Sequence, residues 1–427
     1  MIIAKGKLYD TKEQDRILSY LEDEINETLA EKSLSPETVI NAVDKLCDKV
    51  KKGEFDELIS SLPIDGAEHY KNIAIKLLSR ESIEYKLKTE LGKDFFSSYE
   101  TTPPLGMKSF SVSAHPLGVL LHISAGNVDG LPAFSLAEGL LTGNINILKL
   151  PQADNDLSVR IIAELIAIEP LLSDFIYVFD TPSSDIAAMQ KMAQLCDGIV
   201  LWGGEAACAA VRKLAPIGVK LIEWGHKLSF AYISGYEDKE SELQALADHI
   251  VTTKGLLCSS CQVIYIDTDN FDNVNAFCNE FFPYLQSAAE KHVPPTIDAK
   301  AEISLREYSA KLEALMTGKQ PEKFTSSLCA LVPKSDSNLE LSDMFSSVLV
   351  KPLPHEKIIP VLRRSKSFLQ TVGLICSSDK RAVLTDTFCR AGLVRILKAG
   401  EMSEAFCGEA HDGDYPLRRY VRIVNSR

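Results

Sequence analysis

The chain has 427 residues, of which 45% are hydrophobic and 25% are charged, a composition typical of a soluble globular protein. This length exceeds what one hydrophobic core usually holds, so we expect at least two domains. The formal net charge of −13 argues against a nucleic-acid backbone as the main partner.

The N-terminal residues turn polar at once, and the sequence has no run of about 18 uncharged apolar residues. We therefore expect neither a signal peptide nor a membrane-spanning helix. The ten cysteines are scattered without a pairing pattern. Such a distribution favours a reducing cytoplasm over a disulfide framework.

Residues from about 11 to 98 are predicted to be helical. Leu18, Leu21 and Ile25 share one helical face, and Ser35-Pro36-Glu37 is typical of a helix start with proline in the first turn. No pattern with evident chemistry occurs there, so we assign residues 1–100 to a helical N-terminal region.

Short apolar segments then alternate with helical ones. Strands are predicted at residues 118–123, 146–150, 175–179, 198–202 and 219–223, with helices at 131–141, 156–167, 185–195 and 205–214. Strands separated by helices indicate a parallel sheet with both faces covered.

A second series of strands follows less regularly. We predict them at residues 230–233, 262–267, 328–332, 347–351, 371–376 and 393–397, and expect residues 415–424 to form a basic, extended tail. The fold class is therefore α/β, with two α/β domains.

Three polar residues, Asn127, Lys149 and Glu223, lie at or just beyond the carboxyl ends of predicted strands, and Cys258 follows after an intervening helix. Ligands of open α/β sheets bind at that edge. Each residue alone is more typical of a structural role, such as a turn asparagine, a solvated lysine, an ion-paired carboxylate or a buried thiol. Together the four point more strongly to a site.

Cys258 lies in a predicted loop after Gly255, and Cys258 and Cys261 form a C-x-x-C motif. A zinc site needs about four ligands, and no second C-x-x-C or H-x-x-x-H accompanies this one. A thioredoxin-type motif opens a helix, whereas a strand is predicted here. A metal site and a redox pair are therefore less favoured than a nucleophilic thiol.

Two further features stay open. Gly203 and Gly204 follow a predicted strand and open a helix, which can bring N–H groups near a phosphate, but they do not form the G-x-G-x-x-G fingerprint. Among the histidines, His122 lies within a predicted strand and is assigned a structural role. His226 and His411 remain candidates for chemistry.

Read in order, these segments resemble the aldehyde dehydrogenase superfamily, and more closely its LuxC-type acyl-CoA reductase branch. The motifs that carry the resemblance are His115-Pro-Leu-Gly, Ile147-Leu-Lys-Leu-Pro, Trp202-Gly-Gly-Glu, Glu223-Trp-Gly-His-Lys and Gly255-Leu-Leu-Cys-Ser-Ser-Cys-Gln. Intervals of 22, 74 and 35 residues separate Asn127, Lys149, Glu223 and Cys258 and are close to those of the family.

The resemblance implies an aldehyde dehydrogenase-like fold. A nucleotide-binding domain would span residues 101–227, and a catalytic domain with the nucleophile would span 228–400. The tail, 401–427, would return to the cofactor domain or an interface, and residues 1–100 would pack on the cofactor domain. A homo-oligomer is implied as well, although the long arm usual for its interface is not evident in the sequence.

The implied activity is the NADPH-dependent reduction of a long-chain fatty acyl-CoA to the aldehyde through a thioacyl-enzyme on Cys258. The Asn127 amide and the Cys258 backbone N–H would hold the oxyanion, and Glu223 with His226 would act as general acid and base. The cofactor-binding residues would be Lys149, Gln152, Gly203, Gly204 and Ser124. An acyl-protein synthetase is a further implied partner.

The sequence departs from the family pattern in ways that leave the cofactor and the reaction open. Gln152 replaces a glutamate that would repel a 2′-phosphate, so NADPH is permitted and NADH remains possible. Glu223 could instead activate water, and the protein would then catalyse the NAD(P)-dependent oxidation of aldehydes to acids. The same motifs are compatible with an acyl-phosphate reductase and with a non-catalytic subunit of an acyl-transfer complex.

Overall fold

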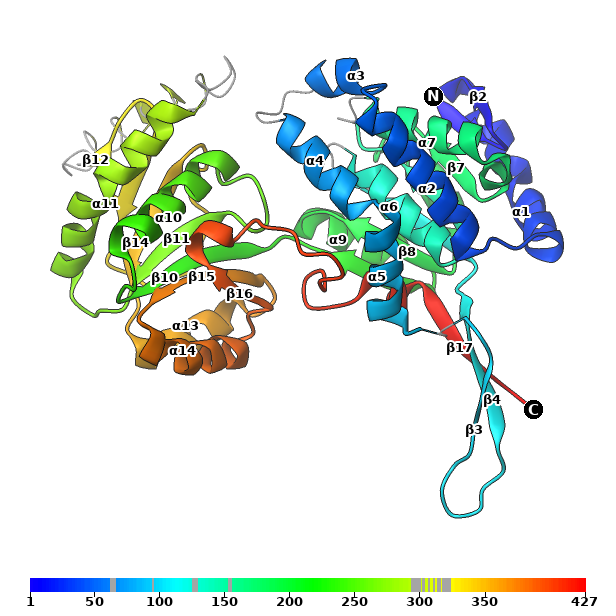
Figure 1. Cartoon of the computed structure of the whole chain (residues 1–427). Coiled ribbons are helices and arrows are strands. Elements are labelled where there is room, and N and C mark those ends of the chain that lie inside the picture. The colour runs from blue at the N-terminus through cyan, green and yellow to red at the C-terminus, as the bar shows by residue number, and fades with distance from the viewer. Residues whose placement is uncertain are drawn as a thin grey trace. The chain divides into compact units, whose positions relative to one another are not determined.

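The computed structural model describes residues 1–61, 67–93, 96–124, 130–152, 156–292 and 324–427, with residues 301, 304–305, 308–309, 312 and 316. The chain divides into two compact units (Figure 1). Unit 1 comprises Met1–Gly225 and Ala405–Arg427, and unit 2 comprises His226–Glu404. The structure is α/β, as predicted.

Unit 1 begins with two short strands that the sequence did not reveal. Strands β1 (Ile2–Ala4) and β2 (Lys7–Tyr9) form a hairpin, and β1 pairs antiparallel with β7 (Ile176–Phe179). Lys5 and Gly6 between them both have positive φ, 46° and 70°. Positive φ angles are typical of a tight hairpin turn, so Gly6 is the residue that could have indicated this turn in the sequence.

The helices that follow agree with the prediction for this region. They are α1 (Gln14–Glu31), α2 (Pro36–Lys51), α3 (Asp56–Ser61), α4 (Ala67–Leu77) and α5 (Arg80–Leu91). The Ser35 side chain caps α2 by accepting a hydrogen bond from the Thr38 backbone N–H, and Pro36 occupies the first helical position, where no N–H donor is needed.

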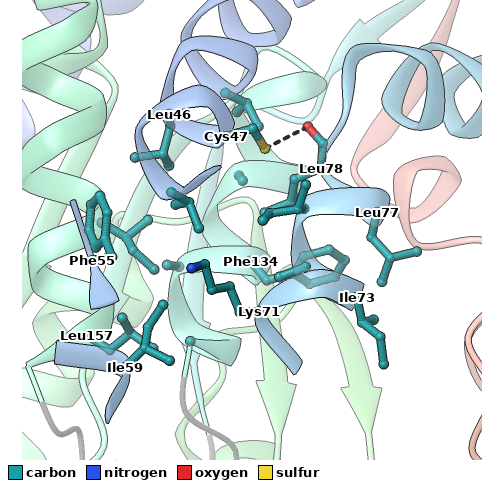
Figure 2. Close-up of a pocket in the computed structure, with 18 of the residues that line it drawn as sticks. Leu46, Cys47, Phe55, Ile59, Lys71, Ile73, Leu77, Leu78, Phe134 and Leu157 are labelled. Carbon is teal, nitrogen blue, oxygen red and sulfur yellow. Dashed lines mark hydrogen bonds between the residues drawn. The ribbon is translucent and has the colours of Figure 1, made fainter. Parts of the chain in front are cut away.

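Helices α2 to α4 lie over α6 (Leu131–Leu141) and α7 (Leu157–Ile168). Leu46 of α2 and Phe134 of α6 border the same space between the two layers (Figure 2).

The sheet of unit 1 has the order β2-β1-β7-β6-β5-β8-β9. Its parallel strands are β5 (Val119–Ile123), β6 (Ile145–Lys149), β7, β8 (Gly198–Trp202) and β9 (Lys220–Trp224), each within one residue of its predicted bounds. Successive strands run outward from β5 on one side and from β8 on the other. The crevice at the carboxyl ends of β5 and β8 is therefore the topological switch point.

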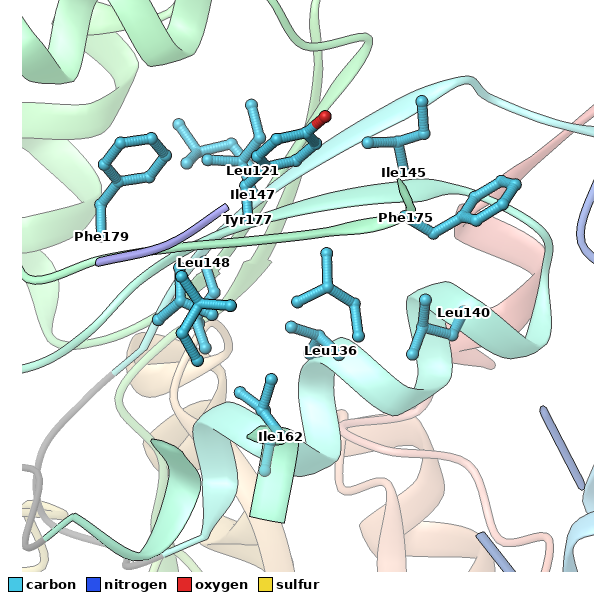
Figure 3. Packing of buried hydrophobic residues seen from close by; sticks show 14 of the residues in the cluster. Leu121, Leu136, Leu140, Ile145, Ile147, Leu148, Ile162, Phe175, Tyr177 and Phe179 are labelled. Carbon is cyan, nitrogen blue, oxygen red and sulfur yellow. The ribbon is translucent and has the colours of Figure 1, made fainter. Parts of the chain in front are cut away.

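Both faces of this sheet are buried, which explains why its strands read as continuous apolar runs. In β6, the neighbours Ile147 and Leu148 point to opposite faces (Figure 3). Leu136 of α6 and Ile162 of α7 pack on the Leu148 face. The other face is covered by α8 (Ile186–Gln194) and α9 (Glu205–Leu214), with α1 against α8.

A separate antiparallel sheet of unit 1 has the order β17-β4-β3. It joins β3 (Tyr99–Thr101) and β4 (Phe110–Pro116) to β17 (Val421–Ser426), and the β3–β4 hairpin extends away from the core of unit 1 (Figure 1). The predicted extended tail is thus correct for β17 but wrong for α15 (Pro416–Arg419), a helical turn that starts at a proline.

Unit 2 contains a second sheet with the order β12-β13-β14-β11-β10-β15-β16. The strands are β10 (Leu228–Ser234), β11 (Cys261–Ile266), β12 (Phe324–Thr325), β13 (Ala330–Pro333), β14 (Ser347–Pro352), β15 (Leu369–Cys376) and β16 (Arg395–Lys398). All are parallel except β12. The six predicted strands are present, with ends shifted by at most two residues.

Helices α10 (Lys239–Thr253), α11 (Phe271–Lys291), α13 (Ile358–Leu362) and α14 (Ser378–Ala391) surround this sheet. Among the described residues of both units, no helix is long and apolar enough to cross a membrane.

Candidate active site

In unit 1, three predicted cofactor-binding residues follow β5 and β6. Lys149 ends β6 and is buried, and its Nζ donates a hydrogen bond to Ser183 Oγ at 3.0 Å. Burial lowers the pKa of Lys149, which nearby Asp180 opposes. Ser124 is buried after β5, and its hydroxyl makes no hydrogen bond within the described part of the chain. Gln152 is exposed. Ser183 had not been predicted.

Asn127, the predicted oxyanion donor, lies outside the described residues. Its role therefore stays a prediction.

The turn between β8 and α9 contains Gly203 and Gly204. The Gly203 N–H donates to the Trp224 carbonyl at 3.2 Å, and Gly204 is the N-cap of α9. A Cβ atom on Gly204 would meet no atom within 4 Å, so the first turn of α9 borders open space. Glu205 in that turn opposes an anion there, which weakens a phosphate assignment.

Glu223 occupies the penultimate position of β9 and forms a bidentate ion pair that the sequence did not reveal. Arg212 of α9 donates from Nε to Oε1 at 2.8 Å and from Nη2 to Oε2 at 2.7 Å. Both carboxylate oxygens are therefore engaged. The planar guanidinium group fixes the orientation of the Glu223 carboxylate. Because Arg212 is exposed, the ion pair contributes little to the stability of the fold.

In unit 2, the predicted nucleophile lies in the loop between α10 and β11. The helix ends at Lys254 and Gly255, whose φ angles are +51° and +75°. Cys258 is exposed, whereas Cys261 opens β11 with 2% of its surface exposed. Burial raises the pKa of Cys261 to about 12, so that thiol stays protonated at neutral pH.

The prediction grouped Cys258 with residues at the carboxyl ends of strands, and this placement is wrong. Cys258 precedes β11 and lies at the amino end of that strand, because α10 runs back across the sheet before the chain enters β11. The Ser229 hydroxyl, near the start of neighbouring β10, donates to the Cys258 carbonyl at 2.7 Å.

Buried polar contacts hold the Cys258 loop. Gln262 Nε2 donates to the Gly255 carbonyl at 2.9 Å, and Gln262 Oε1 accepts from the Ser342 hydroxyl at 2.8 Å and its N–H at 3.2 Å. The Phe345 N–H donates to the Lys254 carbonyl at 2.7 Å. Gly255 and Gln262 belong to the recognised motif, whereas Ser342 and Phe345 come from a distant segment and were not predicted.

A strained segment packs against the same loop. Met344, Phe345 and Ser346 have φ angles of 59°, 45° and 63°, although none is glycine. A Cβ atom at Gly255 would approach Met344 Cα to 3.0 Å. Glycine at position 255 is thus required both by its φ angle and by this close approach.

His226, the predicted partner of Glu223, is the first residue of unit 2, whereas Glu223 belongs to unit 1. The expected domain boundary at residue 227 thus lies two residues beyond the change of unit. The His226 ring is half-buried, with its centroid 6.3 Å from that of Phe368.

The other two histidines have contrasting surroundings in unit 1. His122 is fully buried and hydrogen-bonded through both ring nitrogens, to Ser135 Oγ at 2.8 Å and Asn146 Oδ1 at 2.9 Å. Burial lowers its pKa to about 4, which fits the structural role expected for it. The half-buried His411 ring lies 4.8 Å from Trp202 and 5.0 Å from Trp224, between centroids.

Within the described segments, no group of three or more His, Cys, Asp or Glu side chains could hold a metal ion.

Comparison with solved structures defines the class of fold. The chain is similar to betaine aldehyde dehydrogenase from Staphylococcus aureus in complex with NAD⁺, with a TM-score of 0.70, 16% identity, and coverage of 97% of this chain and 87% of that one. It is also similar to aldehyde dehydrogenase 21 from Physcomitrella patens, with a TM-score of 0.72, 13% identity, and coverage of 98% and 91%. The fold is therefore that of the aldehyde dehydrogenases.

Sequence comparison narrows this class. The profile of the family described as acyl-CoA reductase (LuxC) matches residues 32–423, and the chain belongs to that family. The family comprises oxidoreductases that act on acyl or aldehyde groups. The resemblance stated from the motifs is thus confirmed.

Two relatives are long-chain acyl-protein thioester reductases. The protein of Aliivibrio fischeri is 27% identical over 321 residues, which cover 74% of this chain and 65% of that one. The protein of Vibrio harveyi is 25% identical over 357 residues, which cover 83% and 72%. The match thus spans less than two thirds of the Aliivibrio protein.

Proposed function

We propose that this protein reduces a long-chain fatty acyl thioester to the aldehyde, with Cys258 as the residue that carries the acyl group. The main support is the Cys258 loop, where one thiol of the C-x-x-C motif is exposed and the other is buried. The acyl donor is an acyl-CoA. Because the relatives are named acyl-protein thioester reductases, an acyl group on a protein thiol is an equivalent donor.

The Cys258 thiolate attacks the thioester carbonyl carbon. The bond from that carbon to the CoA sulfur then breaks, and CoA leaves as a thiolate that takes up a proton. The Cys258 N–H and the Asn127 amide donate to the oxyanion, and one such donor is typically worth about 3–4 kcal/mol. After reduction, the thiohemiacetal carbon releases the Cys258 thiolate and the aldehyde forms.

Reduction of the acyl carbon requires a hydride, which a reduced nicotinamide dinucleotide would supply when bound. The residues at the switch point fit such a group, because the buried Ser124 hydroxyl lacks a partner among the described residues and Gly204 borders open space. Ser124, Lys149, Gln152, Gly203 and Gly204 would hold it. The neutral Gln152 amide and the Lys149 cation favour NADPH, with NADH as the second choice.

Glu223, with His226, serves as general acid and base for the Cys258 thiol and for the collapse of the thiohemiacetal. The second candidate function is oxidation of an aldehyde to the acid, for which Glu223 would have to activate water. Arg212 engages both Glu223 oxygens, so Glu223 would have to leave this ion pair before it acts as a base in either reaction. The names of the relatives as thioester reductases favour reduction.

We also propose that the protein forms a homo-oligomer, has an acyl-protein synthetase as a partner and is located in the cytoplasm. None of the ten cysteines forms a disulfide, which suits a reducing compartment.

The test is a direct assay of the purified protein with fatty acyl-CoA of several chain lengths and NADPH. We expect aldehyde to form with stoichiometric loss of NADPH absorbance. Lack of NADPH consumption at every chain length, together with NAD(P)-dependent oxidation of aldehydes, would show that the second function is the right one.

A further inference from the structure

Unit 1 contains an apolar cavity beneath its N-terminal helices. The cavity has a volume of about 390 Å³ and lies between helices α2–α4 and helices α6 and α7 (Figure 2). This volume falls within the range of about 300–1,000 Å³ that is usual for small-molecule sites. Leu46, Phe55, Ile59, Phe134 and Leu157 are among the residues that line it.

The chemistry of the lining excludes most polar ligands. Lys71 is the charged residue among the described residues that line the cavity, and its side chain is largely buried. Its Nζ is already paired with Asp56 at 2.5 Å and with Glu68 at 3.7 Å. An anionic head group would therefore compete with two carboxylates for this cation.

Cys47, the other polar group in the lining, is inert. Its thiol donates to the Leu78 carbonyl at 3.3 Å, and burial raises its pKa to about 11 (Figure 2). A hydrocarbon chain would meet neither a charge without a counter-ion nor a reactive thiol here. The lining thus matches an apolar ligand of low reactivity.

The position of the cavity connects it to the proposed reaction. Gly130 and Leu131 line it at the start of α6, three residues after Asn127 in the sequence. Leu77 and Phe134 also line a second cavity of about 200 Å³ in unit 1, bordered by Trp202 and His411. Trp202 directly precedes the Gly203-Gly204 turn, so the apolar cavity adjoins the predicted cofactor side of unit 1.

We propose that this cavity binds the hydrocarbon chain of the fatty acyl substrate, and that helices α2–α4 form the wall that sets the accepted chain length. The identity of the ligand rests on the proposed function, because the cavity itself requires only an apolar chain. This assigns a role to the helical N-terminal region, most of which lies within the family match that begins at residue 32.

The proposal is tested by placing a larger side chain at the edge of the cavity. Ala74 of α4 lines the cavity and is exposed, so Ala74→Phe adds bulk without displacing the core. Asn72→Phe makes a similar change at an exposed position of α4 that does not line the cavity. Binding of cis-parinaric acid, followed by its fluorescence and competed by tetradecanoic acid, reports on the cavity without any turnover.

Each buried methylene contributes about fourfold in affinity, so loss of room for two methylenes is expected to weaken binding by more than tenfold. We expect that loss in Ala74→Phe, with Asn72→Phe within about twofold of the wild type. In the reductase assay, Ala74→Phe should lower kcat/KM for tetradecanoyl-CoA more than for butanoyl-CoA. Phe134→Ala, which enlarges the cavity, should shift the preference towards longer chains.

The outcomes separate the two proposals. Specific chain binding without acyl-CoA reduction would overturn the proposed function and leave the cavity assignment in place. No binding of either fatty acid, or equal binding by Ala74→Phe and Asn72→Phe, would overturn the cavity assignment even if reduction is observed. The latter result is also expected if a protein surface covers the cavity. Circular dichroism and the Phe134→Ala variant distinguish loss of binding from loss of folding.

Discussion

Cys258 and Cys261 are three residues apart, yet Cys258 is exposed in a loop and Cys261 is buried in β11. Exposure controls access by an acyl thioester, and burial raises the pKa of Cys261 to about 12. Radiolabelled acyl-CoA should therefore label the wild type and Cys261→Ala but not Cys258→Ala. Labelling that survives in Cys258→Ala and disappears in Cys261→Ala would show that Cys261 is the nucleophile instead.

Gln152 carries the proposed preference for NADPH. A carboxylate at this exposed position would repel a 2′-phosphate, so Gln152→Glu should lower kcat/KM for NADPH by about tenfold and change that for NADH much less. Steady-state kinetics with both cofactors measures this. Gln190→Glu adds the same charge at an exposed position of α8 and should alter neither value. Equal losses for both cofactors would remove Gln152 from cofactor selection.

At the scale of elements, the α10–β11 loop is held by Gly255. Gly255→Ala combines an unfavourable φ with an approach of 3.0 Å to Met344 Cα, which should destabilise the fold by about 1–3 kcal/mol and misplace Cys258. Urea unfolding and the rate of Cys258 alkylation would show both effects.

Gly218→Ala is the matched control for Gly255→Ala. Gly218 has a φ of +93° but no atom within 4 Å of a Cβ, so its substitution carries the strain without the clash. If the two substitutions cost the same free energy of unfolding, the contact with Met344 has no role in holding the loop.

The sheet formed by β17, β4 and β3 has open edges and exposed apolar side chains, including Ile423 and Tyr99, and Leu105 is exposed in the β3–β4 connection. Exposed strand edges are templates for pairing with another chain. On the proposal of a homo-oligomer, Ile423→Lys should shift the mass measured by light scattering towards the monomer. Arg422→Ala, at the neighbouring residue of β17, should leave it unchanged. An unchanged mass for Ile423→Lys would place the interface elsewhere.

At the scale of the molecule, unit 2 contains a buried lysine that pairs with two partly exposed carboxylates. Lys351 is fully buried and donates to Asp336 at 2.9 Å and to Glu340 at 2.5 Å. For Asp336, burial alone would raise the pKa, but the hydrogen bonds from Lys351 and the Asn338 N–H, together with the charges of Lys351 and Lys334, outweigh it and the pKa is lowered. The separate hydrogen bond from Lys351 to Glu340 lowers the pKa of Glu340, although burial opposes it.

Both pKa values are lower in the folded protein, so this stabilisation is fully present above the ordinary carboxyl pKa of about 4 and is lost as the pH falls through the lowered values. Lys351→Met should therefore lower Tm at pH 7, and the difference from the wild type should shrink below about pH 4. Calorimetry over this range measures it. Lys334→Met removes an exposed partner of Glu340 and should have a smaller effect. A difference independent of pH would exclude these ion pairs as its source.

The sequence by itself determined the α/β class, the parallel strands of the two large sheets and the place of the Cys258 loop between a helix and a strand. Alternation of apolar and helical segments is a local property, so it can be read along the chain. The motif intervals were likewise sufficient for the family, which the profile match confirms. The roles of Asn127, Lys149, Glu223 and Cys258 in catalysis and cofactor binding remain predictions.

Only the tertiary structure decided which thiol of the pair is exposed, which arginine engages Glu223, and how β1 and β17 join their sheets. It also revealed the apolar cavity under α2–α4. Each of these features depends on contacts between segments far apart in the sequence, such as β17 with β4 and Ser342 with Gln262. Periodicity and motifs describe neighbours along the chain, and burial depends on neighbours in space.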